Sequence, residues 1–278
     1  MRKAHPVALC LLSLVVTAPL VGCGKMQARV EMRKGNELYK KEDFKGALAQ
    51  FQKGIELDPS ATFVWRSVGL SAMALFRPDS DSPENKRYGE QAIEAFKKFL
   101  AAYPNDEKVK DYLLTSYMNA ERYNDALTYL KAEQAKKPTD LKIDNAIVTV
   151  LLKQDKLQDA YDWARGHASK TDKTVYYSLG VTAWDKAYRG GIADPVEKNA
   201  MIDFGMKLLD EALRLDRNYA DAMVYKGLLI RERVKMIPED PVKQQELVAE
   251  AEALRKKAIE LKKKAEEEAA KQANAASA

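Results

Sequence analysis

The stretch that decides the fold is residues 28–61, ARVEMRKGNELYKKEDFKGALAQFQKGIELDPSA. It places small residues at Gly35 and Ala47, a large aromatic residue at Phe51 and a proline at Pro59. Small side chains at the first two positions allow two helices to approach closely, and a large side chain fills the gap to the next pair. The proline cannot continue a helix and therefore ends the second one. These residues predict a helix–turn–helix unit.

The same spacing recurs further along the chain. Gly35 and Gly69 are 34 residues apart, and Ala92, Ala126 and Ala160 follow one another at the same interval. Two further sets keep it, namely Phe96, Leu130 and Ala164, and the pair Pro104 and Pro138. Several independent positions with one shared interval indicate an internal repeat. One helix pair cannot bury its apolar face alone, so the repeats are expected to stack on one another.

On these residues the pattern resembles the tetratricopeptide repeat, a helix–turn–helix of 34 residues. The resemblance covers about residues 28–265. It implies an all-α right-handed superhelix of about six helix–turn–helix repeats. Three repeats would carry loop insertions between their two helices, at residues 76–87, 188–200 and 235–246. Insertions on one edge are often a binding face, and the alternative is that they lengthen the helices without a role in function.

Composition leaves little material for catalysis. The 278 residues carry 46 Lys and Arg against 41 Asp and Glu, a nearly balanced surface that is not typical of a nucleic-acid-binding protein. Two cysteines and two histidines leave almost nothing for a metal site or a disulfide framework. No phosphate loop, dinucleotide-binding motif or zinc-protease motif occurs. His167 is a lone histidine and is predicted to be a packing or surface residue. We therefore expect no catalytic residues, no metal and no cofactor.

The first residues have the order of a secretory signal. A short basic stretch precedes the apolar segment Val7–Leu20, which is shorter than the roughly 20 residues that a membrane-spanning helix needs. Leu20-Val21-Gly22-Cys23 then resembles the lipobox of bacterial lipoproteins, in which the chain is cut before the cysteine. The resemblance implies that Cys23 carries a diacylglycerol and a further acyl chain such as palmitate. The alternative is an ordinary secretory signal in which Cys23 is a chance residue.

These features predict four segments. They are a cleaved signal peptide (1–22), a lipidated tether (23–27), the repeat superhelix (28–265) and an Ala-rich tail that should fray (266–278). In the lipoproteins that the chain resembles, an Asp after the cysteine commonly retains the protein in the inner membrane. Gly24 stands there in this chain. We therefore expect an outer-membrane location facing the periplasm, if the source has two membranes.

The tetratricopeptide resemblance also implies a concave surface made by the first helix of each repeat. The predicted partner-binding groove comprises Arg29, Met32, Asn36, Tyr39, Phe63, Arg66, Leu70, Met73, Tyr177 and Trp184. This mixture of aromatic, methionine and arginine side chains suits a peptide or a partner helix. The groove and the anchor together predict a non-catalytic scaffold that binds another envelope protein and no nucleic acid.

Two narrower alternatives remain open at this stage. Small repeat lipoproteins of this design resemble assembly factors, including those for secretins of type IV pili. The other alternative is a peptide- or glycan-binding lipoprotein presented at the cell surface. Aromatic residues gathered in one place, and not spread along the groove, would favour the second alternative.

Overall fold

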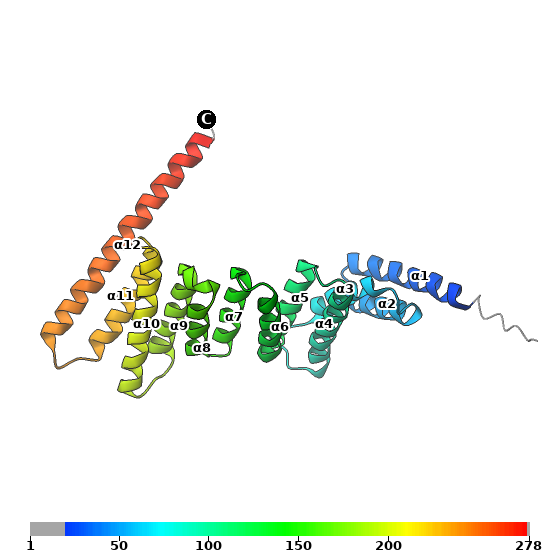
Figure 1. Cartoon of the computed structure of the whole chain (residues 1–278), viewed down its shortest axis with the longest axis horizontal. Helices are drawn as coiled ribbons and strands as arrows, with labels where there is room; N and C mark the ends of the chain where they lie inside the picture. Colours follow the sequence, from blue (N-terminus) through cyan, green and yellow to red (C-terminus); the bar gives the residue numbers. More distant parts are fainter. Residues whose placement is uncertain (1–19, 277–278) are drawn as a thin grey trace, which may run out of the picture. The chain divides into compact units, whose positions relative to one another are not determined.

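The computed structural model describes residues 20–276, and every regular element in that range is a helix (Figure 1). The chain divides into two compact units, the first ending at Arg122 and the second beginning at Tyr123. Unit 1 contains α1 (Leu20–Lys40), α2 (Phe44–Leu57), the short 3₁₀ helix η1 (Thr62–Val64), α3 (Trp65–Leu75), α4 (Pro83–Ala102) and α5 (Glu107–Asn119). Unit 2 contains α6 (Tyr123–Lys136), α7 (Leu141–Lys153), α8 (Leu157–Gly166), the 3₁₀ helix η2 (Ala168–Thr171), α9 (Lys173–Arg189), α10 (Pro195–Leu215), α11 (Ala220–Lys235) and α12 (Pro241–Ala276). The predicted all-α fold is confirmed.

Within each unit, consecutive helices form hairpins. In unit 1, α1 packs against α2 and α3 packs against α4. In unit 2 the hairpins are α7 with α8, α9 with α10 and α11 with α12. Each of these pairs corresponds to one predicted repeat. The two helices of the third predicted repeat, α5 and α6, belong to different units.

The predicted small residues are the points of closest approach in these hairpins. A Cβ atom on Gly35 would lie 2.7 Å from Cε1 of Phe51, and one on Gly180 would lie 2.6 Å from Cγ of Leu209. Such distances are below any van der Waals contact, so only glycine allows the opposite side chain to reach the helix backbone. Phe51 and Leu209 are 2% and 0% exposed. The hairpins are therefore all-α units with the small-against-large contact that the 34-residue spacing predicts.

The three predicted insertions are partly loop and partly helix. The loops between the helices comprise only residues 76–82, 190–194 and 236–240. The remaining residues lengthen the helices, so that α4 has 20 residues and α10 has 21, against 14 in α2. A proline is the first residue of each helix that follows, namely Pro83, Pro195 and Pro241. Proline is tolerated there because the first N–H of a helix needs no partner within it. Three insertion loops are therefore present between the two helices of these repeats, as predicted, but each is shorter than the expected range because the rest of that range lengthens the helices.

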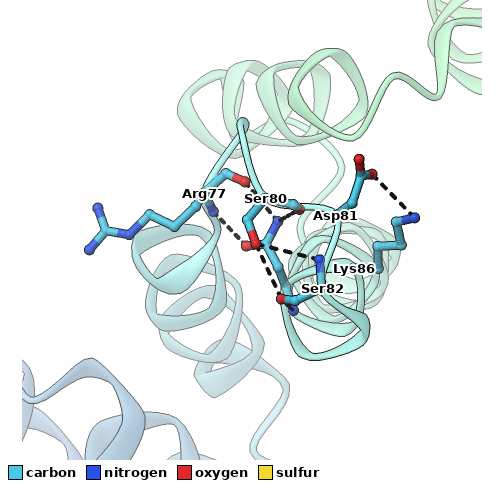
Figure 2. A network of polar contacts seen from close by, with 6 residues as sticks. Arg77, Ser80, Asp81, Ser82 and Lys86 are labelled. Carbon is cyan, nitrogen blue, oxygen red and sulfur yellow. Dashed lines mark hydrogen bonds and ion pairs between the residues drawn. The ribbon is translucent and has the colours of Figure 1, made fainter.

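The loop between α3 and α4 is held by one buried side chain. Asn85 is 5% exposed, and its Oδ1 accepts a hydrogen bond of 2.6 Å from the backbone N–H of Arg77. Its Nδ2 donates to the backbone carbonyls of Arg77 and Ser80, at 2.7 Å each (Figure 2). Ser82 in turn caps α4 by accepting from the N–H of Asn85 at 3.2 Å. The asparagine amide therefore takes the place of backbone hydrogen bonds in this turn.

The two ends of the described chain can be compared with the predicted signal peptide, tether and tail. Residues 1–19 of the signal peptide lie outside the described residues, and α1 begins at Leu20, so the predicted tether 23–27 is helical. In the described part of the chain, no helix combines the length and apolar character needed to span a membrane. At the other end α12 continues to Ala276, through most of the segment that is expected to fray. Its side chains from Lys262 to Asn274 are exposed.

Candidate partner-binding site

Met32 does not lie on an open groove. It is 7% exposed, and its side chain packs on α2 where Gly54 leaves space. A Cβ atom on Gly54 would lie 2.8 Å from Cγ of Met32. Methionine is unbranched and flexible, so it fills such a gap readily. The sequence prediction for this residue is therefore corrected: Met32 belongs to the core of the first hairpin.

The other predicted groove residues of α1 differ in their exposure to solvent. Arg29 and Asn36 are exposed. Tyr39 is half-buried, and its ring meets that of Phe44 edge-on, with centroids 5.1 Å apart. On α1 the predicted groove thus offers two polar side chains and one tyrosine that is already in contact with its own hairpin.

The predicted residues of the second repeat are partly engaged within unit 1. Arg66 pairs with Asp106 at the start of α5, at 4.0 Å. Met73 lines a small internal cavity between α3, α4 and α5, and Leu70 is half-buried. Phe63 in η1 is 59% exposed. Unit 1 therefore presents Phe63 as an isolated aromatic side chain, without a second ring beside it in the described contacts.

In unit 2, by contrast, five rings gather on α9, on α11 and at the residue just before α11. We call Tyr177, Trp184, Tyr188, Tyr219 and Tyr225 the aromatic cluster. The ring centroid of Tyr177 lies 5.2 Å from that of Tyr219 and 5.6 Å from that of Tyr225. Trp184 meets Tyr225 edge-on at 5.3 Å and stacks on Tyr188 at 5.3 Å. Such offset and edge-on arrangements are favourable between aromatic rings and hold them in place.

Three cations border the aromatic cluster. Lys173 lies 4.9 Å from the ring centroid of Tyr219, Lys235 lies 5.6 Å from Tyr188, and Arg189 lies 5.7 Å from Trp184. Cations at such distances are attracted by the negative face of a ring. Each one also pairs with a carboxylate, the three partners being Asp216 for Lys173, Glu232 for Lys235 and Asp185 for Arg189. The border of the cluster is therefore polar but nearly neutral.

The phenol groups of Tyr177 and Tyr219 remain protonated at neutral pH. Burial raises the pKa of Tyr177 to about 12, with further contributions from Tyr225 and Asp221. Burial also raises the pKa of Tyr219, and the carboxylate of Asp221 acts in the same direction. A protonated phenol both donates and accepts hydrogen bonds. The cluster thus combines flat apolar faces with neutral hydroxyl groups.

This arrangement suits a ligand with apolar faces and exposed carbonyl or hydroxyl groups. Rigid aromatic side chains supply a large contact area at a small cost in conformational entropy, which is why tyrosine and tryptophan are enriched at binding hot spots. Extended peptides are commonly bound in grooves lined by such rings. Tyr188 is 55% exposed and offers an accessible ring.

Only part of the aromatic cluster was predictable. Tyr177 and Trp184 are among the predicted groove residues, and the structure brings these two together with three tyrosines that the prediction missed. Tyr188 lies at the end of α9, and Tyr219 lies just before α11. The prediction considered only the four inward positions of each first helix. The available signal was a tyrosine just before α11, Tyr219, and a second one within it, Tyr225.

His167 has the packing role that its position predicts. Its ring stacks on Trp163 with a centroid separation of 3.8 Å and an angle of 6°. Its Nδ1 lies 2.9 Å from the backbone carbonyl of Trp163. Over the described range, no group of three or more His, Cys, Asp or Glu side chains is arranged to hold a metal ion.

No model of a known protein family matches this chain. Among solved structures it is similar to YrrB, described as a TPR protein with an unusual peptide-binding site, at 20% identity and a TM-score of 0.41, over 73% of this chain and 93% of YrrB. It is also similar to the C-terminal part of a TPR repeat-containing protein from Cytophaga hutchinsonii, at 13% identity and a TM-score of 0.49, over 83% and 78% of the two chains. A third is PilW, a type IV pilus biogenesis factor, at 14% identity and a TM-score of 0.40, over 81% and 90%. The class of this protein, an all-α repeat protein, follows from its own hairpins and glycine contacts.

Proposed function

We propose that this protein is a non-catalytic scaffold of the bacterial cell envelope that holds a segment of another envelope protein on its aromatic cluster. The observation that carries the proposal is the contact network of Tyr177, Trp184, Tyr188, Tyr219 and Tyr225. Four tyrosines and one tryptophan, each with its ring against another ring, form a preorganised aromatic surface. A peptide segment in extended form fits this chemistry.

The second part of the proposal is the anchor. We infer that Cys23 carries the lipid, because Leu20-Val21-Gly22-Cys23 completes a basic stretch and an apolar segment at the start of the chain. One acyl chain binds a membrane only marginally, and two or more make the attachment stable. The protein would then face the periplasm from the outer membrane.

A labelling experiment tests the anchor by itself. Cells that express the wild type or Cys23→Ser are grown with an alkynyl palmitate analogue, and the protein is isolated and probed. We expect label on the wild type and none on the variant, together with an uncleaved precursor. Equal labelling of both proteins would refute the lipoprotein proposal without affecting the aromatic cluster.

Capture from detergent-solubilised envelopes tests the binding site. Trp184→Ala with Tyr225→Ala removes two rings from the centre of the aromatic cluster and should abolish capture of the partner. Hot-spot residues each contribute about 2 kcal/mol or more, so two losses would weaken binding by roughly a thousandfold if they were additive. Circular dichroism and thermal unfolding must show that the variant is folded.

The matched control carries two substitutions in the predicted groove of unit 1, Tyr39→Ala with Arg66→Ala. We expect this control to capture the partner as the wild type does. Loss of capture by the control alone would move the binding site to unit 1 and overturn the assignment to the aromatic cluster. Full capture of the partner by both folded variants would also overturn the assignment to the aromatic cluster.

The peptide- or glycan-binding alternative is favoured by one observation, the gathering of the aromatic residues in one place. Sugar rings also bind to flat aromatic faces that are bordered by hydrogen-bonding groups. Retention of the wild type on immobilised envelope glycan, and its loss in Trp184→Ala with Tyr225→Ala, would support this alternative over a protein partner. A captured pilus or secretin component would instead narrow the scaffold to an assembly factor.

A further inference from the structure

A second site in unit 2 is a pocket of about 410 Å³ between α8, η2, α9 and α10. Its walls include Tyr161 and Arg165 of α8, Lys170 of η2, Tyr176 of α9, and Glu211 and Arg214 of α10. None of these residues belongs to the aromatic cluster or to the predicted groove. The chemistry of the pocket is different, because positive charge dominates its lining.

Two of the three cations in this pocket have no carboxylate partner. Arg165 and Lys170 form no ion pair with any residue that the structure describes. Arg214 donates from Nε to Glu211 at 2.8 Å, which leaves its two terminal nitrogens for another acceptor. A fourth cation, Lys207, lies 5.2 Å from the ring centroid of Tyr161, and Arg165 lies 5.2 Å from the same centroid. Three cations face one carboxylate in the lining, so a dianion would balance the charge.

The two tyrosines add neutral donors to the same pocket. Tyr161 and Tyr176 are each 3% exposed, yet both reach the pocket wall. Neither hydroxyl forms a hydrogen bond with another described residue. Neither hydroxyl oxygen is among the buried atoms that lack a partner, so both reach the opening of the pocket, where they can donate to an oxygen of a bound ligand. Burial raises the pKa of the Tyr176 phenol, and the nearby carboxylate of Glu211 acts in the same direction. This hydroxyl is therefore a donor at neutral pH.

We propose that this pocket binds a phosphate group, held by Arg165, Lys170 and Arg214 and by the hydroxyls of Tyr161 and Tyr176. The planar guanidinium group matches two oxygens of a phosphate at once, and lysine supplies a further point charge. A phosphate monoester carries close to two negative charges at neutral pH, which matches the excess of two cations in the lining. A single carboxylate would leave one of those charges and several donors without a partner.

The phosphate could belong to a small soluble molecule or to a lipid headgroup. Both offer the same oxygens to the pocket, but a headgroup diester carries one charge and a monoester carries nearly two. The charge of the pocket therefore favours the monoester. This site is independent of the proposed scaffold function, and either can fail without the other.

The test uses the full chain and inorganic phosphate at pH 7, with ionic strength held constant by chloride. Isothermal titration should show saturable binding to the wild type. Arg165→Gln with Lys170→Gln should weaken that binding by about tenfold or more, equivalent to about 1.4 kcal/mol. The matched control is Lys256→Gln with Lys257→Gln, which removes two exposed cations from α12 in the same unit and should bind phosphate as the wild type does.

A second pair of variants tests the hydroxyl groups alone. Tyr161→Phe with Tyr176→Phe keeps both rings and the local packing, so folding should be preserved while phosphate binding weakens. Vesicles of phosphatidylglycerol, compared with phosphatidylcholine, distinguish the source. If the wild-type protein sediments with phosphatidylglycerol vesicles and the variant Arg165→Gln with Lys170→Gln does not, the ligand is a lipid headgroup. Saturable binding of inorganic phosphate without such sedimentation supports a soluble ligand. The proposal would be overturned if the wild type showed neither saturable phosphate binding nor sedimentation that the variants change. Equal phosphate binding by all folded variants would also overturn it.

Discussion

The ring of Phe96 lies directly against the backbone of Gly69, so closely that a Cβ atom on that glycine would be 2.4 Å from Cε1 of the ring. Phe96 is fully buried between α3 and α4, and its ring also contacts that of Tyr112 at 5.7 Å. The ring cannot move away without disturbing its other neighbours. The second hairpin thus depends on the absence of a side chain at residue 69.

Gly69→Ala should therefore destabilise unit 1. Overpacking of a well-filled core costs about 1–3 kcal/mol, and the gain in helix propensity from Gly to Ala is at most about 1 kcal/mol. Urea unfolding monitored by circular dichroism measures the difference. Gly166→Ala is the matched control, because a Cβ atom there would meet nothing within 4 Å. An unchanged midpoint for Gly69→Ala would contradict the contact.

Asn85→Ala should destabilise the loop between α3 and α4. The substitution removes three hydrogen bonds and leaves the N–H of Arg77 and the carbonyls of Arg77 and Ser80 without their partner. Arg77 is exposed and Ser80 is half-buried, so water can replace part of the lost hydrogen bonds, and we expect a total cost of about 1–3 kcal/mol. Asn85→Asp keeps the shape but cannot donate to the two carbonyls, and it should also be destabilising. Amide exchange of the loop should accelerate in both variants, and wild-type exchange rates would contradict the role of Asn85.

Unfolding at alkaline pH should report on Tyr177. Its pKa is raised from 10.0 to about 12 in the folded protein, so the unfolded state loses this proton first as the pH rises. The stability that the protonated phenol provides is fully present below pH 10 and is lost as the pH rises toward 12. Tyr177→Phe should flatten the fall of the unfolding midpoint over this range. Tyr103→Phe removes one phenol from unit 1 as a control, and a slope unchanged by Tyr177→Phe would contradict the raised pKa.

The sequence predicted the hairpins well because their geometry depends on few residues. Gly35 opposite Phe51 is a steric requirement that repeats with the chain, and such requirements are visible as spacing. Met32 was misplaced because its environment depends on Gly54, a second glycine on the partner helix that the repeat pattern does not specify. A flexible side chain turns toward whatever space its neighbours leave.

The two sites of unit 2 were harder to foresee for different reasons. The aromatic cluster contains Tyr219 and Tyr225, which occupy positions that vary between repeats. The pocket proposed to bind phosphate combines residues of α8, η2, α9 and α10, and Arg165 and Arg214 line it together only because the intervening helices fold back. Residue spacing in the sequence does not indicate that these side chains line one pocket. Only the packing of the helices shows it.

The final stretch of α12 is tied to α11 near its start, where Lys262 pairs with Asp221 at 2.7 Å. Beyond Leu261 its described side chains are exposed, and its supports are exposed ion pairs such as Lys263 with Glu267 at 3.9 Å and Lys264 with Glu268 at 4.0 Å. Such pairs contribute a few tenths of a kcal/mol each and weaken with salt. While this stretch is helical, its rise of about 1.5 Å per residue makes it a rod of roughly 22 Å from Leu261 to Ala276. Salt or heat would therefore turn the rod into a flexible chain with a similar mean span, of roughly 20 Å, and a longer maximum reach, while the hairpins of unit 2 stay folded.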